Sequence, residues 1–274
     1  MKTFKRRIVQ VITAVLYNCN FVGFASGRIY RGKLKNACVP GLNCYSCPGA
    51  VGACPLGSLQ QSLVSSKYRF PYYMLGMLLL FGALFGRFVC GFLCPFGFIQ
   101  ELLYKIPSRK LKKNKVTAAL TYLKYVILIV FALLIPVIFK IPGFCKYICP
   151  QGILQGGIPL SILNGQVRAM LGNLFVVKLA ILIVVILAAV IIFRVFCRFI
   201  CPLGAIYSFF NRISLFRMEV EEDRCTHCNA CVSFCKMDIK KVGDRECIQC
   251  GECAGVCVAE AIVRKPFKGK NKEF

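Results

Sequence analysis

The sequence predicts a mainly α-helical membrane protein, in which four transmembrane helices form an internal repeat and a small α+β domain follows. Three observations predict this class. Of the 274 residues 57% are hydrophobic, with a mean hydropathy of +0.65; the chain has 19 cysteines; and one short phrase occurs four times. So apolar a chain is unusual for a soluble domain. An odd number of cysteines beside long apolar runs favours metal or cluster ligation over disulfides.

Four apolar runs approach the length of about 20 residues that a helix needs to cross a hydrocarbon core. They cover residues 8–26, 70–86, 116–139 and 169–193. The first run is interrupted by Gln10 and by Asn18 to Asn20, and a cleaved signal peptide is its alternative interpretation. Lys124 and Lys178 lie within the third and fourth runs, where we expect each side chain to extend to the membrane interface.

A cysteine–proline phrase accompanies the apolar runs. Its four copies are "CPLGSLQ" at Cys54, "CPFGFIQ" at Cys94, "CPQGILQ" at Cys149 and "CPLGAIY" at Cys201. In the last three copies, another cysteine lies four residues before the cysteine of the phrase, at Cys90, Cys145 and Cys197. Proline is favoured at the first position of a helix. Each phrase therefore predicts a cysteine just before a helix start, where free amides and the positive end of the helix dipole face a bound anion.

Helix direction predicts how these cysteines combine. Because successive membrane helices run in opposite directions, the phrases at Cys54 and Cys149 are expected on one membrane face and those at Cys94 and Cys201 on the other. We predict that one [4Fe-4S] cluster is bound by Cys90, Cys94, Cys197 and Cys201. Arg87 and Arg194 precede two of these cysteines by three residues. They would offset the charge of the cluster, and contact with lipid headgroups is the alternative.

The ligands of a second membrane cluster are less directly indicated. We predict that it is bound by Cys145, Cys149, Cys47 and Cys54. The alternative is that Cys38, Cys44, Cys47 and Cys54, which all lie between the first and second apolar runs, bind a cluster by themselves. Cys19, within the first apolar run, is expected to be a buried thiol.

A change in composition near Met218 predicts three parts: a transmembrane domain at 1–217, a cysteine-rich domain at 218–264 and a basic tail at 265–274. Ten of the eleven acidic residues lie from Glu219 onward, whereas residues 1–218 contain 26 basic residues and only Glu101. The positive charges flank apolar runs rather than forming one basic face. They favour membrane lipids and anionic cofactors as partners, and not nucleic acid.

The cysteine-rich domain contains two C-x2-C-x2-C-x3-C runs. Three closely spaced cysteines bind three corners of a cubane, and the fourth ligand comes from the other run. One cluster is predicted at Cys225, Cys228, Cys231 and Cys257, and another at Cys247, Cys250, Cys253 and Cys235. Structural zinc sites usually pair two C-x2-C units across a longer spacer. The spacing in this domain therefore favours iron–sulfur clusters over zinc. There is no C-x-x-C-H motif for covalent haem, and the single histidine, His227, is expected to be solvated.

These motifs carry a family resemblance. Residues 217–264 resemble the bacterial-type 2[4Fe-4S] ferredoxins, except that Lys236 and Val258 replace the proline usual after each fourth cysteine. The chain as a whole resembles the NapH/NosR-like membrane polyferredoxins. The resemblance implies an electron-transfer subunit of an oxidoreductase complex. Such a subunit passes electrons between a cytoplasmic or quinone-pool partner and an extracytoplasmic acceptor, such as a flavin-binding or reductase protein.

Topology and mechanism follow as expectations. Basic residues at the N-terminus and in 105–115 favour a multi-pass protein of the cytoplasmic membrane with both termini in the cytoplasm. Two of the four predicted clusters would lie near opposite faces of a core about 30 Å thick. Electron transfer then requires deeper clusters, or a quinone or flavin between them. The alternatives are a quinol-oxidising subunit, with Glu101, Lys124 or Lys178 as proton acceptor, and a redox regulator or maturation factor of a metalloenzyme.

Overall fold

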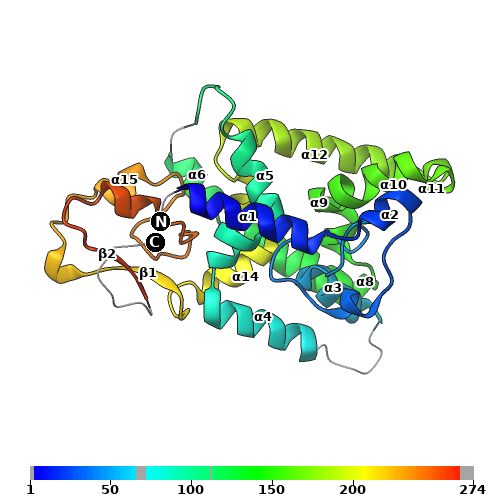
Figure 1. Ribbon diagram of the computed structural model, residues 1–274, viewed down its shortest axis with the longest axis horizontal. Coiled ribbons are helices and arrows are strands. Elements are labelled where there is room, and N and C mark those ends of the chain that lie inside the picture. The colour runs from blue at the N-terminus through cyan, green and yellow to red at the C-terminus, as the bar shows by residue number, and fades with distance from the viewer. Residues whose placement is uncertain (1–2, 66–71, 112, 266–274) are drawn as a thin grey trace.

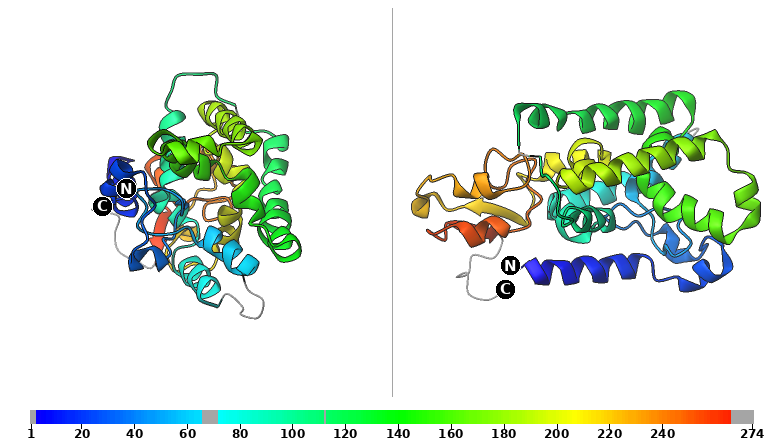
Figure 2. Two further views of the ribbon diagram at one scale, coloured as in Figure 1. Left: turned by 90° about the vertical axis from the view of Figure 1, so that its right-hand side faces the viewer. Right: turned by 90° about the horizontal axis from the view of Figure 1, so that it is seen from above.

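The computed structural model describes residues 3–65, 72–111 and 113–265. Of the predicted basic tail, only Lys265 lies within the described residues. The molecule is mostly helical, as predicted, with a helical bundle at one end of its long axis and a small module with a two-stranded sheet at the other (Figures 1 and 2).

Four helical segments run along the bundle. They are α1 (Thr3–Tyr17), α4 (Tyr72–Phe85), the segment Lys115–Phe139 and α12 (Asn173–Ile191). The third segment comprises α6 (Lys115–Leu120), α7 (Leu123–Ile127), η3 (Leu128–Leu134) and α8 (Ile135–Phe139). Among the described residues, two helices are long and apolar enough to cross a membrane, Lys115–Phe139 and Asn173–Ile191. Helix α4 is apolar but shorter.

The first apolar run does not form one helix. Helix α1 ends at Tyr17, and α2 (Phe21–Ser26) follows after a break. At this break, Asn18 Nδ2 donates to Ala14 O, and Asn20 Nδ2 donates to Pro48 O at 3.0 Å. The polar side chains thus bond to backbone carbonyls, one of them in the following loop. The fourth run also differs from its predicted bounds, because α11 (Gly165–Ala169) ends before α12 begins.

After three of the long helices, the chain turns sharply back into the bundle. The turns contain residues with positive φ: Gly86 (φ 51), Lys140 (φ 55) and Arg194 (φ 51). A short helical turn then contains the first cysteine of each pair, in η2 (Val89–Leu93), η4 (Phe144–Ile148) and α13 (Val195–Phe199).

A short helix starts at each cysteine–proline phrase and returns toward the surface. These helices are α3 (Pro55–Ser65), α5 (Pro95–Leu103), α9 (Pro150–Gly152), continued by η5 (Ile153–Gly157) and α10 (Ile158–Leu163), and α14 (Pro202–Phe210). Figure 1 shows α5, α9 and α14 in the interior. The direction of α5 is clear from its ends. Cys94 lies against Gly41 in the bundle, whereas Glu101 pairs with Arg6 near the start of α1.

The C-terminal module contains strand β1 (Arg217–Val220), paired antiparallel with β2 (Ile262–Lys265). Between the strands lie η6 (Glu222–Arg224), α15 (Ala230–Phe234) and η7 (Glu252–Val256). In the first segment of the chain, η1 (Lys33–Asn36) precedes the loop that leads to α3.

Buried ion pairs attach this module to the bundle. Glu246 accepts from Arg87 Nη1 at 2.7 Å and also pairs with Lys124. Burial alone would raise the pKa of Glu246, but the two adjacent positive charges lower it below its ordinary value. Lys124 is fully buried, so it does not extend to an interface as predicted. A further buried pair joins Arg198 to Asp238.

We predict that Glu246→Ala destabilises the protein, because Arg87 and Lys124 would remain buried without their shared carboxylate. Breaking a buried pair of this kind costs about 3–5 kcal/mol. The measurement is the denaturation midpoint of the purified protein in detergent. The matched control is Arg212→Ala, which removes the exposed pair with Asp244 and should cost less than about 1 kcal/mol. A Glu246→Ala effect no larger than that of the control would contradict the prediction.

Candidate metal centres

Sixteen of the 19 cysteines gather in four sets, each lining one cavity. We name them in order from the C-terminal module into the bundle. The distal set is Cys225, Cys228, Cys231 and Cys257; the proximal set is Cys235, Cys247, Cys250 and Cys253; the inner set is Cys90, Cys94, Cys197 and Cys201; and the outer set is Cys44, Cys54, Cys145 and Cys149.

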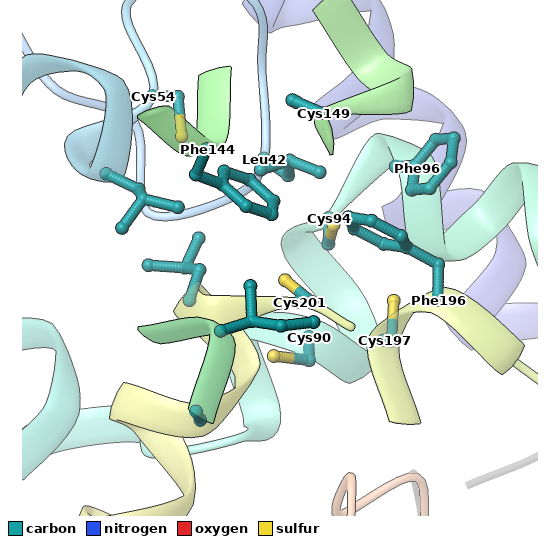
Figure 3. Close-up of a cluster of buried hydrophobic side chains, with 14 of the residues drawn as sticks. Leu42, Cys54, Cys90, Cys94, Phe96, Phe144, Cys149, Phe196, Cys197 and Cys201 are labelled. Carbon is teal, nitrogen blue, oxygen red and sulfur yellow. The ribbon is translucent and has the colours of Figure 1, made fainter. Parts of the chain in front are cut away.

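The inner set brings together the four cysteines that the repeat analysis combined. Cys90 and Cys94 come from the turn before α5, and Cys197 and Cys201 from the turn before α14. All four are buried, and their cavity is closed by apolar side chains that include Val89 and Leu203. Figure 3 shows these cysteines within the hydrophobic core of the bundle.

Two buried arginines cross between the halves of the inner set. Arg87 Nη2 donates to Cys197 O at 3.4 Å, and Arg194 donates to Cys90 O. Both arginines are fully buried, so they do not reach lipid headgroups. Glu101 balances Arg194 at 2.7 Å and also pairs with Arg6. Each repeat therefore supplies a positive charge to the cysteine turn of the other.

The outer set differs from the predicted set in one residue. Cys44, rather than Cys47, lines the cavity with Cys54, Cys145 and Cys149. Cys47 is buried elsewhere, with its Sγ 3.6 Å from Asn18 Oδ1.

The other two cysteines outside the sets also lie apart from them. Cys38 Sγ lies 3.3 Å from Met74 Sδ and does not line the outer cavity. The alternative set of Cys38, Cys44, Cys47 and Cys54 is thus not gathered around that cavity. Cys19 is exposed, and not buried as predicted.

Lys178 also differs from its prediction. Its side chain does not extend away to an interface. Its Nζ donates to Cys145 O at 3.2 Å and the residue lines the outer cavity. The outer set thus has a neighbouring cation, as the inner set has two.

A repeated glutamine joins the paired cysteine turns, a role that the sequence analysis missed. The glutamine ends three of the four phrases. Gln100 Oε1 accepts from Phe196 N at 2.9 Å and its Nε2 lies 3.1 Å from Cys197 Sγ. Gln155 Oε1 accepts from Cys44 N at 2.9 Å, and Gln60 Oε1 accepts from Cys145 N at 3.4 Å. The glutamine that ends these phrases was visible in the sequence, but the groups to which it hydrogen-bonds were not.

Backbone amides at the starts of the short helices face the cysteine sulfurs. Gly204 N donates to Cys201 Sγ at 3.4 Å. In two other phrases the amides of Gly57 and Gly152 lie near Cys54 and Cys149, where they favour the thiolate form. Four sulfur donors, helix-start amides and a nearby cation form a suitable site for a thiolate-bound, anionic cluster.

One loop physically connects the inner and outer sets. Pro40 O accepts from Tyr207 Oη at 2.9 Å, and a Cβ added at Gly41 would lie 2.6 Å from Leu93 O. The next residue, Leu42, lines both cavities and lies between the two sets in Figure 3. The sets therefore share a wall, and they are not separated by the thickness of a hydrocarbon core.

The proximal set lies against the inner set in a similar way. Ile248 directly follows Cys247 in the proximal loop. Its carbonyl oxygen lies so close to Gly91 of the inner turn that a Cβ added at Gly91 would overlap it. Asn211 Nδ2 also donates to Cys247 O at 2.9 Å. In the proximal loop, burial raises the pKa of the Cys253 thiol to about 12. Cys253 is therefore a neutral thiol when nothing is bound, and a bound cationic group such as iron would favour its thiolate form.

Sets of four cysteines with these spacings are typical of an iron–sulfur protein, and comparison with known proteins agrees. The chain matches a 4Fe-4S binding domain at residues 70–114, 124–159 and 174–220. Each match contains one C-x3-C-P phrase. No solved structure matches the chain.

Two proteins of Methanocaldococcus jannaschii, both described as uncharacterized, are similar to the chain. MJ0749 is 31% identical over 198 residues, covering 69% of this chain and 68% of the relative. MJ0750 is 33% identical over 187 residues, covering 65% of this chain and 71% of the relative. The chain belongs to the same family, whose hallmark here is the 4Fe-4S binding domain.

The different positions of Cys44 and Cys47 yield a direct prediction. Cys44→Ser should lower the iron content of anaerobically purified protein by about four atoms per chain, the content of one cubane. Cys47→Ser, the matched control, should leave the iron content unchanged because its thiol lies outside the set. Iron and acid-labile sulfide are measured on both variants. Loss of iron in Cys47→Ser but not in Cys44→Ser would contradict this assignment.

Proposed function

We propose that the protein transfers electrons along a series of four [4Fe-4S] clusters, between a partner at the C-terminal module and a partner at the opposite end of the bundle. The observation that supports this proposal is the order of the four cysteine sets, in which the proximal and inner sets touch and the inner and outer sets share Leu42. When bound, the clusters would supply one-electron redox centres. The four sets named above are their proposed ligands.

The fold supports a location in a membrane. Two helices have the length and composition of membrane spans, and we propose α1 and α4 as the other two. Short helices that begin inside a membrane protein are tolerated where they are covered by protein, and their positive ends suit anionic groups. We place the C-terminal module and the start of α1 in the cytoplasm, in line with the basic residues near them.

The chain itself performs three tasks in this proposal. Its cysteines bind the clusters, and its buried cations offset their negative charge. Its core side chains, among them Phe96, Phe196 and Leu203, exclude water from the inner site. Leu42 spans the boundary between the inner and outer sites, so no quinone or flavin is needed between them.

Direct quinol oxidation is less well supported. Glu101 is engaged by Arg6 and Arg194, and Lys124 by Glu246. Both are held in ion pairs, and the third candidate, Lys178, donates to Cys145 O beside the outer set. The resemblance to NapH/NosR-like polyferredoxins supports an electron-transfer subunit, and the family relatives leave its physiological partners open to experiment.

The proposal predicts electron transfer across a sealed membrane. Proteoliposomes containing the protein would enclose ferricyanide, and a membrane-impermeant viologen radical would be added outside. We expect the enclosed ferricyanide to be reduced. Cys201→Ser, which removes an inner ligand, should slow this reduction at least about tenfold, a modest effect for loss of a redox centre. A rate in Cys201→Ser equal to that of the unaltered protein, or a rate in the unaltered protein no higher than in protein-free liposomes, would contradict the proposal.

A further inference from the structure

The end of the bundle farthest from the C-terminal module is positively charged. We call it the outer end, and define it by six exposed basic residues in the segments that gather there: Arg28, Arg31, Lys33, Lys140, Lys146 and Arg168. Residues 1–218 contain one acidic residue, Glu101. That residue lies toward the opposite end and is paired with Arg6 and Arg194. The outer end therefore has positive charge without compensating carboxylates.

The basic residues of the outer end have no ion-pair partner among residues 3–65, 72–111 and 113–265. The C-terminal module is different. There, Arg217 and Lys265 both pair with Glu219, and Arg224 pairs with Glu221. Within the described part of the chain, the outer end thus holds a group of exposed basic residues without ion pairs; Lys105, Arg109 and Lys115, in the segment after α5, form another such group.

The outer cysteine set is more accessible than the inner set. Cys44 and Cys145 are partly exposed, whereas all four cysteines of the inner set are buried. The cavity at the outer set has a volume of about 700 Å³, against about 10 Å³ at the inner set. Lys146 directly follows Cys145 and is exposed. A partly exposed cysteine set therefore lies beside an exposed lysine that has no ion pair among the described residues.

We propose that the outer end is the docking surface for an acidic electron-transfer protein. Complementary charge accelerates encounter and orients the partner, and like charge excludes others. Lipid headgroups lie at the level of the helix ends and are the alternative ligand of these charges. The tip of the C-terminal module differs from the outer end because it also carries acidic residues that are exposed or partly exposed, namely Glu221, Glu222, Asp223 and Glu260.

The redox role of the docked protein rests on the function proposed above, but the binding itself does not require loaded clusters. The test therefore measures binding. The full-length chain is placed in nanodiscs of phosphatidylcholine and immobilised. Two probes share one fold and differ in charge: horse cytochrome c, which is basic, and the same protein with succinylated lysines, which is acidic. Affinity is measured by interferometry at several salt concentrations.

We expect the succinylated probe to bind, with an affinity that falls as salt rises. The Lys140→Glu/Lys146→Glu variant should weaken this binding about tenfold, within the range of charge-steered association. The matched control is Lys240→Glu/Lys241→Glu, which reverses two exposed charges on the C-terminal module and should leave the binding unchanged. A second variant, Arg168→Glu, should weaken it in the same direction.

Three results would overturn the proposal: binding of the acidic probe that is insensitive to salt, equal loss in the control variant, or unchanged binding in both outer-end variants. Flotation with phosphatidylglycerol vesicles tests the lipid alternative. Reduced flotation of the outer-end variants with unchanged probe binding would show that the charges bind lipid instead. Iron analysis of the same samples separates the two proposals, because charge-dependent docking with few bound clusters would reject the electron-transfer function and not the docking surface.

Discussion

The structure depends on four short helices that begin inside the bundle rather than at its surface. A helix start exposes backbone amides that need a partner, and in an apolar interior an unpaired amide is costly. At the start of α14 the cysteine that precedes the proline provides the partner, through the bond from Gly204 N to Cys201 Sγ. The same geometry brings the thiols to the centre of the molecule from both ends. The cysteine sets and the interior helix starts are therefore one feature, and each would be unfavourable without the other.

Charge is balanced locally around this arrangement. Arg87 and Arg194 are fully buried beside the inner set, and each has its own carboxylate, Glu246 and Glu101 respectively. Buried charges are tolerated when they are paired and hydrogen-bonded. Glu246 also belongs to the C-terminal module, immediately before Cys247. The pair that neutralises Arg87 therefore also fixes the proximal set against the inner set, so that charge balance and the spacing of the sites have the same cause.

The sequence predicted the mostly helical class and the small sheet, and the structure places the distal, proximal and inner cysteines in the predicted groups. Regular spacing is the reason that these groups could be proposed from the sequence, and cluster binding by them stays a prediction. The outer set was less predictable, because the segment before Cys54 lacks the four-residue spacing. The choice of Cys44 depends on Gln155, which is distant in sequence. Lys124 was expected at an interface because its partner, Glu246, is 122 residues away. The sequence left two possibilities, deeper sites or a quinone or flavin between them, because short interior helices resemble ordinary loops in a hydropathy pattern.

The central claim is that four clusters form one continuous row, with two of them inside the bundle. The most direct measurement is a cryo-electron microscopy map of protein purified without oxygen. The account predicts four compact, strong densities that bridge the distal, proximal, inner and outer sets in that order, with Leu42 between the last two. Density in the distal and proximal sets alone, with the thiols of the bundle unbridged, would contradict it.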